Sequence, residues 1–345
     1  MRTRMASVFA SLAMLGGCSA SGSSSPTFNP AAGGGAGTAG GGGAVGGSGG
    51  SAGSAGFGGA LIDGGGGKQG CNAVDILFVI DNSSSMCTYE KGLVQAFPFF
   101  VDAVNDALPD GIDLHVGITT SSFCSGGSHS ETNCVAQESA ATIQSVFKRP
   151  MDGMQPGNGF QGRLLEQGGK SFVAAKTGDP QSVQAMKDWF GQAAISVGCT
   201  GCAFDFTVGA AGYAAHPAND PTNAGFFRDE GAVLLLFVLT DEADHSTESL
   251  ASYHDMITAR KTKCGGDNCI ITGALLSKFC AQKPNVQIWE FLNMFGEAPV
   301  WGDITGGSNN PLFQPPDPKE YTKVIADALA PVVKQTCDKI PPPIR

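Results

Sequence analysis

The chain has 345 residues, of which 50 are glycine and 11 are cysteine, and its formal net charge is −10 at pH 7. An acidic chain is repelled by phosphate backbones, so we exclude nucleic acid as a partner. A hydrophobic fraction of 42% leaves enough apolar material for a sizeable core once a glycine-rich segment is set aside.

The chain begins with the features of an export signal. A basic start, MRTR, precedes an apolar stretch from Ala6 to Leu15 that is too short to span a bilayer. The following Gly16-Gly17-Cys18 resembles the lipobox of bacterial lipoproteins, which implies acylation at Cys18 and membrane attachment by lipid alone. The residue after Cys18 is Ser19 and not the aspartate that marks inner-membrane retention in enteric bacteria. We therefore expect an exported protein anchored in the cell envelope, at the outer membrane of a Gram-negative bacterium.

Composition divides the rest of the chain into a linker, a domain and a tail. Residues 19–70 are almost wholly Gly, Ala and Ser, so they lack the apolar side chains that would offset the entropy of ordering. They are expected to form a disordered tether after the signal peptide, residues 1–18. One folded domain is expected over residues 71–337, followed by a proline-rich tail at 338–345.

Ten cysteines remain once Cys18 is assigned to the lipid, an even number in an exported chain. Disulfide bonds are their expected use, although sequence alone cannot choose the pairing. Short loops favour Cys124 with Cys134 and Cys264 with Cys269, and a bond between Cys71 and Cys337 would join the two ends of the domain. The full set is Cys71, Cys87, Cys124, Cys134, Cys199, Cys202, Cys264, Cys269, Cys280 and Cys337.

A short apolar run ends in three oxygen-bearing side chains spaced as D-x-S-x-S. Ile76 to Ile80 is typical of a strand buried on both faces, and Asp81, Ser83 and Ser85 follow it directly. Hydroxyl and carboxylate oxygens are ligands that Mg²⁺ prefers, so the turn is a candidate cation site. It is also compatible with a serine-rich turn in which Asp81 or Ser83 caps the next helix.

A second apolar run, Ala232 to Asp241, also ends in an aspartate. It is longer and more hydrophobic than the first, which favours a central strand of a parallel sheet. Open α/β sheets place their ligand crevice at the carboxyl ends of such strands. Asp241 is therefore expected to lie close to Asp81.

These two signals together resemble the von Willebrand factor A domain and its metal-ion-dependent adhesion site. The resemblance covers most of residues 75–337, and it implies that Asp81, Ser83, Ser85, one threonine and Asp241 surround one divalent cation, Mg²⁺ or else Ca²⁺ or Mn²⁺. The threonine is assigned to Thr200, because a Gly-rich turn leading into a small-residue helix precedes the last strand in that family. Thr119 and Thr120 are the competing candidates, although they look like a strand end.

The resemblance implies an α/β fold with a doubly wound, mostly parallel central sheet flanked by helices, of the von Willebrand factor A or Rossmann-like kind. It also implies a non-enzymatic adhesion or interaction module, whose cation accepts a carboxylate from a protein ligand. The segments FVIDNSSSM, VGCTGC, NAGFFR and LTDEADHS are similar to those of exported, cysteine-rich domains from myxobacteria and their relatives. The alternatives are an envelope scaffold with a vestigial or structural ion, and an accessory subunit of an ATPase-driven complex.

Other elements follow from periodicity. Apolar residues from Leu93 to Leu108 recur at helical spacing, with a kink or a broken first turn expected at Pro98. An amphipathic helix is expected from Tyr321 to near Cys337. Further strands are expected at 268–276 and 286–292, and an insertion around 124–178 accounts for the long gap between Ser85 and Thr200.

Three other motifs give weaker hypotheses. Asp241-Glu242-Ala243-Asp244 spells a helicase box, but no phosphate loop follows a strand, so no nucleotide is expected. The C-x-x-C around Thr200 is typical of redox pairs, yet the order of strands does not fit one. Asp244 and His245 could add a zinc or second cation site, although an exposed loop histidine is the simpler expectation.

Overall fold

The computed structural model describes residues 70–123, 139–150, 157–202, 204–277, 286–308 and 315–340, and the structural statements below concern these ranges. The signal peptide with Cys18, the tether up to residue 69, the end of the tail, and Cys124, Cys134 and Cys280 lie outside them. Within these ranges, no helix combines the length and the apolarity needed to cross a membrane.

A six-stranded sheet in the order β3-β2-β1-β4-β5-β6 forms the centre of the fold. All neighbouring strands pair in parallel except β2 and β3, which are antiparallel. Every residue of β1 and β4 is buried, as their continuous apolar runs predict. The strands are β1 (Ala73–Ile80), β2 (Asp113–Thr120), β3 (Phe172–Lys176), β4 (Ala232–Thr240), β5 (Ile270–Leu276) and β6 (Val300–Asp303).

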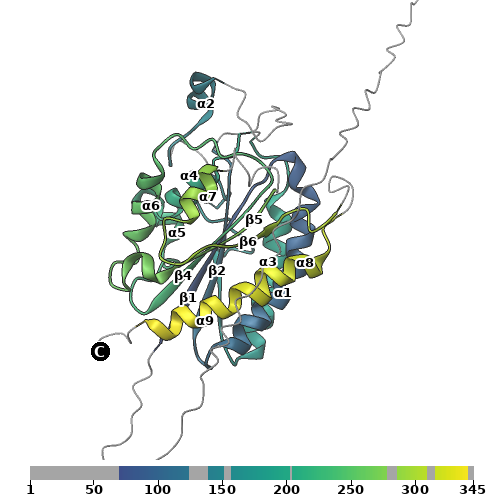
Figure 1. Cartoon of the computed structure of the whole chain (residues 1–345), viewed down its shortest axis with the longest axis vertical. Helices are drawn as coiled ribbons and strands as arrows, with labels where there is room; N and C mark the ends of the chain where they lie inside the picture. The colour runs from purple at the N-terminus through teal and green to yellow at the C-terminus, as the bar shows by residue number, and fades with distance from the viewer. Residues whose placement is uncertain are drawn as a thin grey trace, which may run out of the picture. The chain divides into compact units, whose positions relative to one another are not determined.

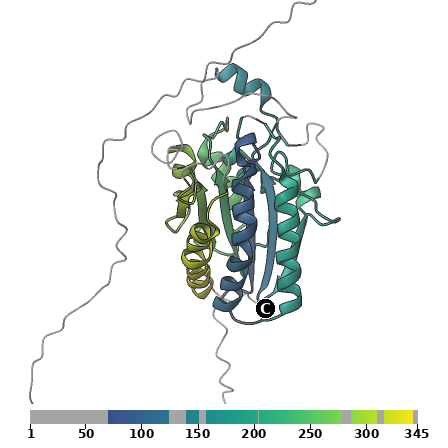
Figure 2. The ribbon, with the colours of Figure 1, turned by 90° about the vertical axis from the view of Figure 1, so that its right-hand side faces the viewer.

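Helices cover both faces of the sheet (Figures 1 and 2). On one face, α1 (Tyr89–Ala107) packs against α3 (Pro180–Val197), α8 (Pro318–Thr322) and α9 (Leu329–Lys339), while α4 (Thr207–Ala214), α6 (Leu250–Thr258) and α7 (Val286–Leu292) pack together on the other. The remaining helices are η1 (Ser84–Cys87), α2 (Ala140–Val146), η2 (Pro217–Asn219), α5 (Asp220–Asn223), η3 (Gly266–Cys269) and η4 (Lys323–Ala328). This arrangement confirms the predicted doubly wound, mostly parallel α/β fold.

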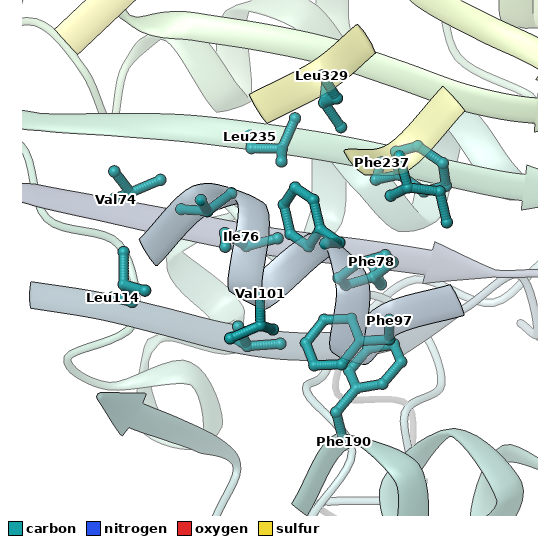
Figure 3. Packing of buried hydrophobic residues seen from close by; sticks show 14 of the residues in the cluster. Val74, Ile76, Phe78, Phe97, Val101, Leu114, Phe190, Leu235, Phe237 and Leu329 are labelled. Atoms are coloured by element: carbon teal, nitrogen blue, oxygen red, sulfur yellow. The ribbon is translucent and has the colours of Figure 1, made fainter. Parts of the chain in front are cut away.

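The two apolar cores follow from the alternation of side chains along each strand. On β1, Ile76 and Phe78 face the α1 side and Leu77 and Val79 face the α4 side. In the first core, the rings of Phe97 on α1 and Phe190 on α3 stack with centroids 3.5 Å apart, and Phe78 lies beneath them (Figure 3). These contacts hold α1 and α3 over the sheet, so the start of α1 has a fixed position beside the end of β1.

Three disulfide bonds lie within the described residues. Cys71 and Cys337 join the start of β1 to α9 with their Cα atoms 4.7 Å apart, and Cys264 pairs with Cys269, so both of these predicted bonds are confirmed. The third bond joins Cys87 to Cys199. Cys202 is also disulfide-bonded.

One local prediction, a strand at 286–292, was wrong. Residues 286–292 form helix α7 and not a strand, because Ile288, Phe291 and Leu292 are buried at the i, i+3, i+4 spacing of one helix face. Helix α1 runs from Tyr89 to Ala107 with Pro98 inside it, so the proline does not break the helix, whose apolar face is packed against the core; a kink at Pro98 stays a prediction. The expected strand near 268–276 is confirmed as β5.

Two further segments differ in extent from their expectations. The stretch around 124–178, expected as an insertion, contains the edge strand β3 near its end, so this part belongs to the central sheet. The C-terminal amphipathic helix is present as three consecutive pieces, α8, η4 and α9, with η4 a π-helical turn. Neither difference affects the assignment of β1 and β4, which lead into the candidate site.

Candidate functional site

Asp81 lies at the carboxyl end of β1, between the ends of β2 and β4. Its backbone N–H donates to the Leu239 carbonyl at 2.9 Å, and the N–H of Ser121 donates to the Ile80 carbonyl at 3.1 Å. The Asp81 carboxylate accepts the Ser83 backbone N–H at 2.7 Å, which closes the turn. Ser83 flanks η1 without using its hydroxyl as a cap. The helix-cap interpretation therefore does not account for that hydroxyl.

Four of the five predicted metal ligands come together at this turn. The hydroxyl oxygens of Ser83 and Ser85 lie 3.1 Å apart, and the Ser85 hydroxyl donates to Oδ1 of Asp241 at 2.9 Å. Asp241 directly follows β4, so two separate strands supply the carboxylates. Asp81, Ser83, Ser85 and Asp241 are hereafter called the DSSD cluster.

Thr240, one residue before Asp241, also contributes to this cluster. Its hydroxyl donates to Oδ2 of Asp81 at 2.7 Å and accepts the Glu242 N–H at 3.1 Å. Both oxygens of Asp81 thus accept hydrogen bonds, Oδ1 from the turn after β1 and Oδ2 from the end of β4. The sequence analysis missed this role because the final threonine of a strand has no signal that separates it from core.

Asp205, which the sequence analysis did not select, lies beside Asp81 and is fully buried. Its Oδ1 accepts the Ser121 hydroxyl at 2.5 Å, and its carbonyl accepts the His245 N–H at 2.7 Å. Its other oxygen, Oδ2, has no hydrogen-bond donor among the described residues. An acidic residue just before a small-residue helix was the available signal, but a hydroxyl was sought at that point.

Carboxyl groups in and around the cluster favour their neutral forms. Burial, followed by the charge of Asp81, raises the pKa of Asp241 to about 7. The same two causes raise the pKa of Glu90, on the first turn of α1, to about 8. Burial and the charges of Asp81 and Glu242 raise the pKa of Asp205 well above its usual range. Such carboxylates can be neutralised by protons or by a cation.

The predicted threonine, Thr200, is exposed on the loop between Cys199 and Cys202. No hydrogen bond joins it to the DSSD cluster within the described ranges. Its neighbour Gly201 donates its N–H to the Asn82 carbonyl at 2.8 Å, and a Cβ at Gly201 would lie 2.3 Å from Oδ1 of Asn82. This loop therefore rests against the D-x-S-x-S turn through Gly201.

The competing threonines are engaged elsewhere. The hydroxyls of Thr119 and Thr120, at the end of β2, both donate to the Gly159 carbonyl, at 2.9 and 3.1 Å. Both side chains are buried. Their hydrogen bonds tie β2 to the Gly159 loop and leave the cluster without a threonine from that strand.

Asp244, in the loop after β4, caps the start of a helix. Its Oδ1 accepts the N–H of Val208 at 2.9 Å, and Ser246, which it binds, accepts the N–H of Gly209 at 2.7 Å. The two side chains thereby cap the start of α4, whose own flanking residue, Phe206, cannot. The expectation of an exposed His245 was wrong, because this ring is 4% exposed and packs edge-on against Phe204.

The donor set fits a hard divalent cation. No three Asp, Glu, His or Cys side chains in the described ranges meet at metal-binding spacing. The cluster instead mixes two hydroxyls with carboxylates, the oxygen ligands that Mg²⁺, Ca²⁺ and Mn²⁺ accept. Oδ2 of Asp205, near this turn, is buried without a hydrogen-bond donor among the described residues.

No protein-family model matches the chain, and no curated protein matches it. Among solved structures, the chain is similar to a von Willebrand factor type A protein from Catenulispora acidiphila, at 15% identity and a TM-score of 0.33 over 77% of this chain and 42% of that chain. It is also similar to the open conformation of the pilus adhesin SpaC from Lactobacillus rhamnosus GG, at 11% identity and a TM-score of 0.40. That match covers 77% of this chain and 30% of the adhesin chain. A second form of that adhesin is similar at 10% identity and a TM-score of 0.39, over 77% of this chain and 31% of that chain.

The chain spans less than half the length of the solved chain in each of these three structures, between 30% and 42%. The assignment of the fold rests on the strand order and pairing of this chain itself. That order has the architecture implied by the sequence resemblance to the von Willebrand factor A domain, a doubly wound α/β sheet with a ligand edge at the carboxyl ends of its strands.

Proposed function

We propose that this chain binds a divalent cation at the DSSD cluster and uses the bound ion to hold a protein ligand. The observation that carries the proposal is the convergence of Asp81, Ser83, Ser85 and Asp241 from two distant parts of the sequence. Burial raises the pKa of Asp241 to about 7, and a bound cation would stabilise the charged form of this carboxyl.

Each residue has a role in the proposed site. Ser83 and Ser85 would offer their hydroxyl oxygens to the ion, and Asp81 and Asp241 would balance its charge directly or through water. Ser83 is 3% exposed, whereas Ser85 and Asp241 are half-buried, so the solvent-facing side of the cluster is the side of Ser85 and Asp241. A carboxylate from a partner protein would complete the coordination from that side. Mg²⁺ is the first choice, with Ca²⁺ and Mn²⁺ as alternatives.

The proposed setting is the cell envelope. Acylation at Cys18 and the glycine-rich tether at 19–70 would hold the domain away from the outer membrane of a Gram-negative bacterium. The proposal assigns no catalytic reaction to the chain, and its partner is a protein, not a nucleic acid or a nucleotide. The rival functions are a scaffold with a structural ion and an accessory subunit of an ATPase-driven complex.

Metal-dependent capture of a partner tests this function. The whole chain is immobilised and incubated with envelope and secreted proteins in Mg²⁺ or in EDTA, beside an Asp81→Asn variant. The proposal expects a protein that is retained in Mg²⁺ and released by EDTA, and that the variant does not retain. Capture that persists in EDTA would favour the scaffold, and retention of an ATPase would favour the accessory subunit.

A further inference from the structure

We infer that residues 199–202, the loop that carries Thr200, hold the D-x-S-x-S turn in the shape that binds the ion. This loop is hereafter called the brace loop. The inference rests on the proposed function, because it concerns affinity for the same ion. It gives the loop a positioning role, exerted through the Cys87–Cys199 disulfide bond and through Asn82, and it takes no ligand atom from Thr200.

The disulfide bond joins the brace loop to the short helix that carries Ser85. Cys87 is the last residue of η1, two positions after Ser85. Its bond to Cys199 holds together two Cα atoms that are 112 residues apart in sequence and 5.3 Å apart in space. A single turn of 3₁₀ helix has few hydrogen bonds of its own, so this cross-link contributes to the position of Ser85.

Asn82 lies between the first two oxygen-bearing side chains of the turn and is held by the brace loop and the end of β2. Its carbonyl accepts the Gly201 N–H at 2.8 Å, and its Oδ1 accepts the Ser122 hydroxyl at 2.7 Å. The Ser122 hydroxyl oxygen in turn accepts the Cys202 N–H at 3.0 Å. Asn82 and Ser122 are 2% and 0% exposed, so water does not compete for these bonds.

Close packing joins the same two segments. A Cβ at Gly201 would lie 2.3 Å from Oδ1 of Asn82 and 2.6 Å from its Nδ2, far inside van der Waals contact. Gly201 is not in the left-handed region, so a larger residue there meets a steric obstacle and not backbone strain. The backbone and the side chain of Asn82 are therefore both fixed before any ion binds.

This positioning acts on affinity for the ion. The hydroxyl oxygens of Ser83 and Ser85 lie 3.1 Å apart in the braced turn, and a site that is already in place loses less conformational entropy on binding. Residues that orient metal ligands typically contribute about 10- to 100-fold to metal affinity. Because coupling between two equilibria is reciprocal, the bound ion must also favour the intact Cys87–Cys199 bond by the same factor.

Titration calorimetry with MgCl₂ tests the inference on the whole chain without reductant, with circular dichroism to establish that each variant is folded. Replacing Cys87 and Cys199 together by serine should weaken Mg²⁺ binding by about ten-fold. Gly201→Ala, which displaces Asn82 and leaves every disulfide bond intact, should weaken it by a similar factor.

Two matched controls should bind Mg²⁺ within about two-fold of the unmodified chain. Replacing Cys71 and Cys337 together by serine opens a disulfide bond at the opposite end of β1, with a longer loop. Gly191→Ala adds a methyl group in α3, where its nearest neighbour is a methyl carbon of Val94 at 3.9 Å.

Reduction of the folded, unmodified chain gives a readout that a merely structural cross-link would not move. In dithiothreitol, the Cys87–Cys199 bond takes up two electrons and two protons to give two thiols, while the dithiol closes to its cyclic disulfide. Saturating Mg²⁺ should lower the equilibrium constant of this reduction by about ten-fold and leave that of Cys264–Cys269 unchanged. Thiol alkylation and peptide mapping measure both bonds in one sample.

Three results would overturn the inference: affinity within about two-fold of the unmodified chain in the folded Cys87 and Cys199 double variant, an equal loss in the Cys71 and Cys337 control, or a reduction equilibrium that does not respond to Mg²⁺. If the double variant does not fold, Gly201→Ala decides by the same criterion. If Asp81→Asn still loses binding, the proposed function survives such a result. If the unmodified chain binds no Mg²⁺, both fail.

Discussion

A buried ion cluster lies near the amino-terminal end of β1, opposite the end that leads into Asp81. Asp75 and Lys261 are both 0% exposed, with Nζ of Lys261 donating to Oδ2 of Asp75 at 2.9 Å. Nε of Arg228 donates to Oδ1 of Asp75 at 2.7 Å. Burial lowers the pKa of Lys261, and the adjacent Asp75 opposes that shift. The cluster joins β1 to the segments before β4 and after α6.

Lys261→Met should destabilise the protein by about 3 kcal/mol, because it removes one of the cations that balance the buried Asp75 and leaves Arg228 and a His115 contact at 3.8 Å. The free energy of unfolding in urea measures the effect. Lys334→Met is the control, since Lys334 forms an exposed pair with Asp338 and its loss should cost at most about 1 kcal/mol. Equal effects of the two substitutions would show that burial does not matter to this pair.

Glu90 gives a prediction for pH. Its folded pKa of about 8 lies above the usual value of 4.5, so its contribution is fully present below pH 4.5 and is lost as the pH rises through 8. In EDTA, Glu90→Gln should therefore match the unmodified chain at pH 4.5 and be more stable at pH 8. The two stability curves should diverge by up to about 1.4 kcal/mol per pH unit in between. Parallel curves across this range would contradict the assignment.

The residues of the cluster that were predictable share one property. Asp81, Ser83 and Ser85 follow one buried run and Asp241 follows another, so strand topology alone brings them to one edge. Asp205 follows no strand, and its place depends on hydrogen bonds to Ser121 and on the parallel bridge with Asp244. Contacts of this kind are set by tertiary packing, which a single sequence does not encode in any local pattern.

Among the elements, α1 carries the clearest local conflict. Pro98 lies inside a helix of 19 residues, where it has no N–H to donate to the carbonyl of Val94. Phe97 and Phe100 on either side are fully buried. Packing of these aromatic residues outweighs the preference of proline for the first turn of a helix. The helix therefore continues past Pro98.

Pro98→Ala should stabilise the protein by about 1–2 kcal/mol, since it restores one helical hydrogen bond and loses only some rigidity of the unfolded chain. The midpoint of urea unfolding is the measurement. Gln95→Ala, an exposed position on the same helix, is the control and should change stability by about 0.5 kcal/mol or less. A midpoint for Pro98→Ala at or below that of the unmodified chain would contradict the account of α1.

Strands were more predictable than short helices. β1 and β4 are continuous apolar runs that end in aspartate, and both were found where expected. α7 was mistaken for a strand because five of the residues in VQIWEFL are apolar, which makes either period acceptable over seven residues. Seven residues are too few for length to separate a helix from a strand. The burial of one face of α7 against α6 identifies it as a helix.

For the whole molecule, the disulfide bonds differ most in the length of chain that they close. Cys71 and Cys337 are 266 residues apart, whereas Cys264 and Cys269 are 5 apart. A longer loop removes more conformational entropy from the unfolded chain. The Cys71–Cys337 bond also holds α9 beside the start of β1, where the Cys71 N–H donates to the Cys337 carbonyl at 3.0 Å.

Replacing Cys71 and Cys337 together by serine should therefore cost roughly 3 kcal/mol more than replacing Cys264 and Cys269, from the ratio of loop lengths. Chemical unfolding of the two double variants without reductant gives the comparison. A larger loss from the short bond would show that strain or local packing, and not loop closure, governs these cross-links.

The doubly wound fold was predictable because two buried runs with acidic ends carry the resemblance to the von Willebrand factor A domain, and that resemblance implies the fold. The signal peptide, the lipid at Cys18 and the tether remain predictions from sequence, as they lie outside the described residues.

The central claim is that the DSSD cluster holds a divalent cation. Titration calorimetry of MgCl₂ into the whole chain, compared with Asp81→Asn and Ser83→Ala, tests it most directly, with circular dichroism to confirm that the fold persists. The account predicts binding to the unmodified chain that both variants lose while they stay folded. Absence of binding to the unmodified chain, or unchanged affinity in folded variants, would contradict it.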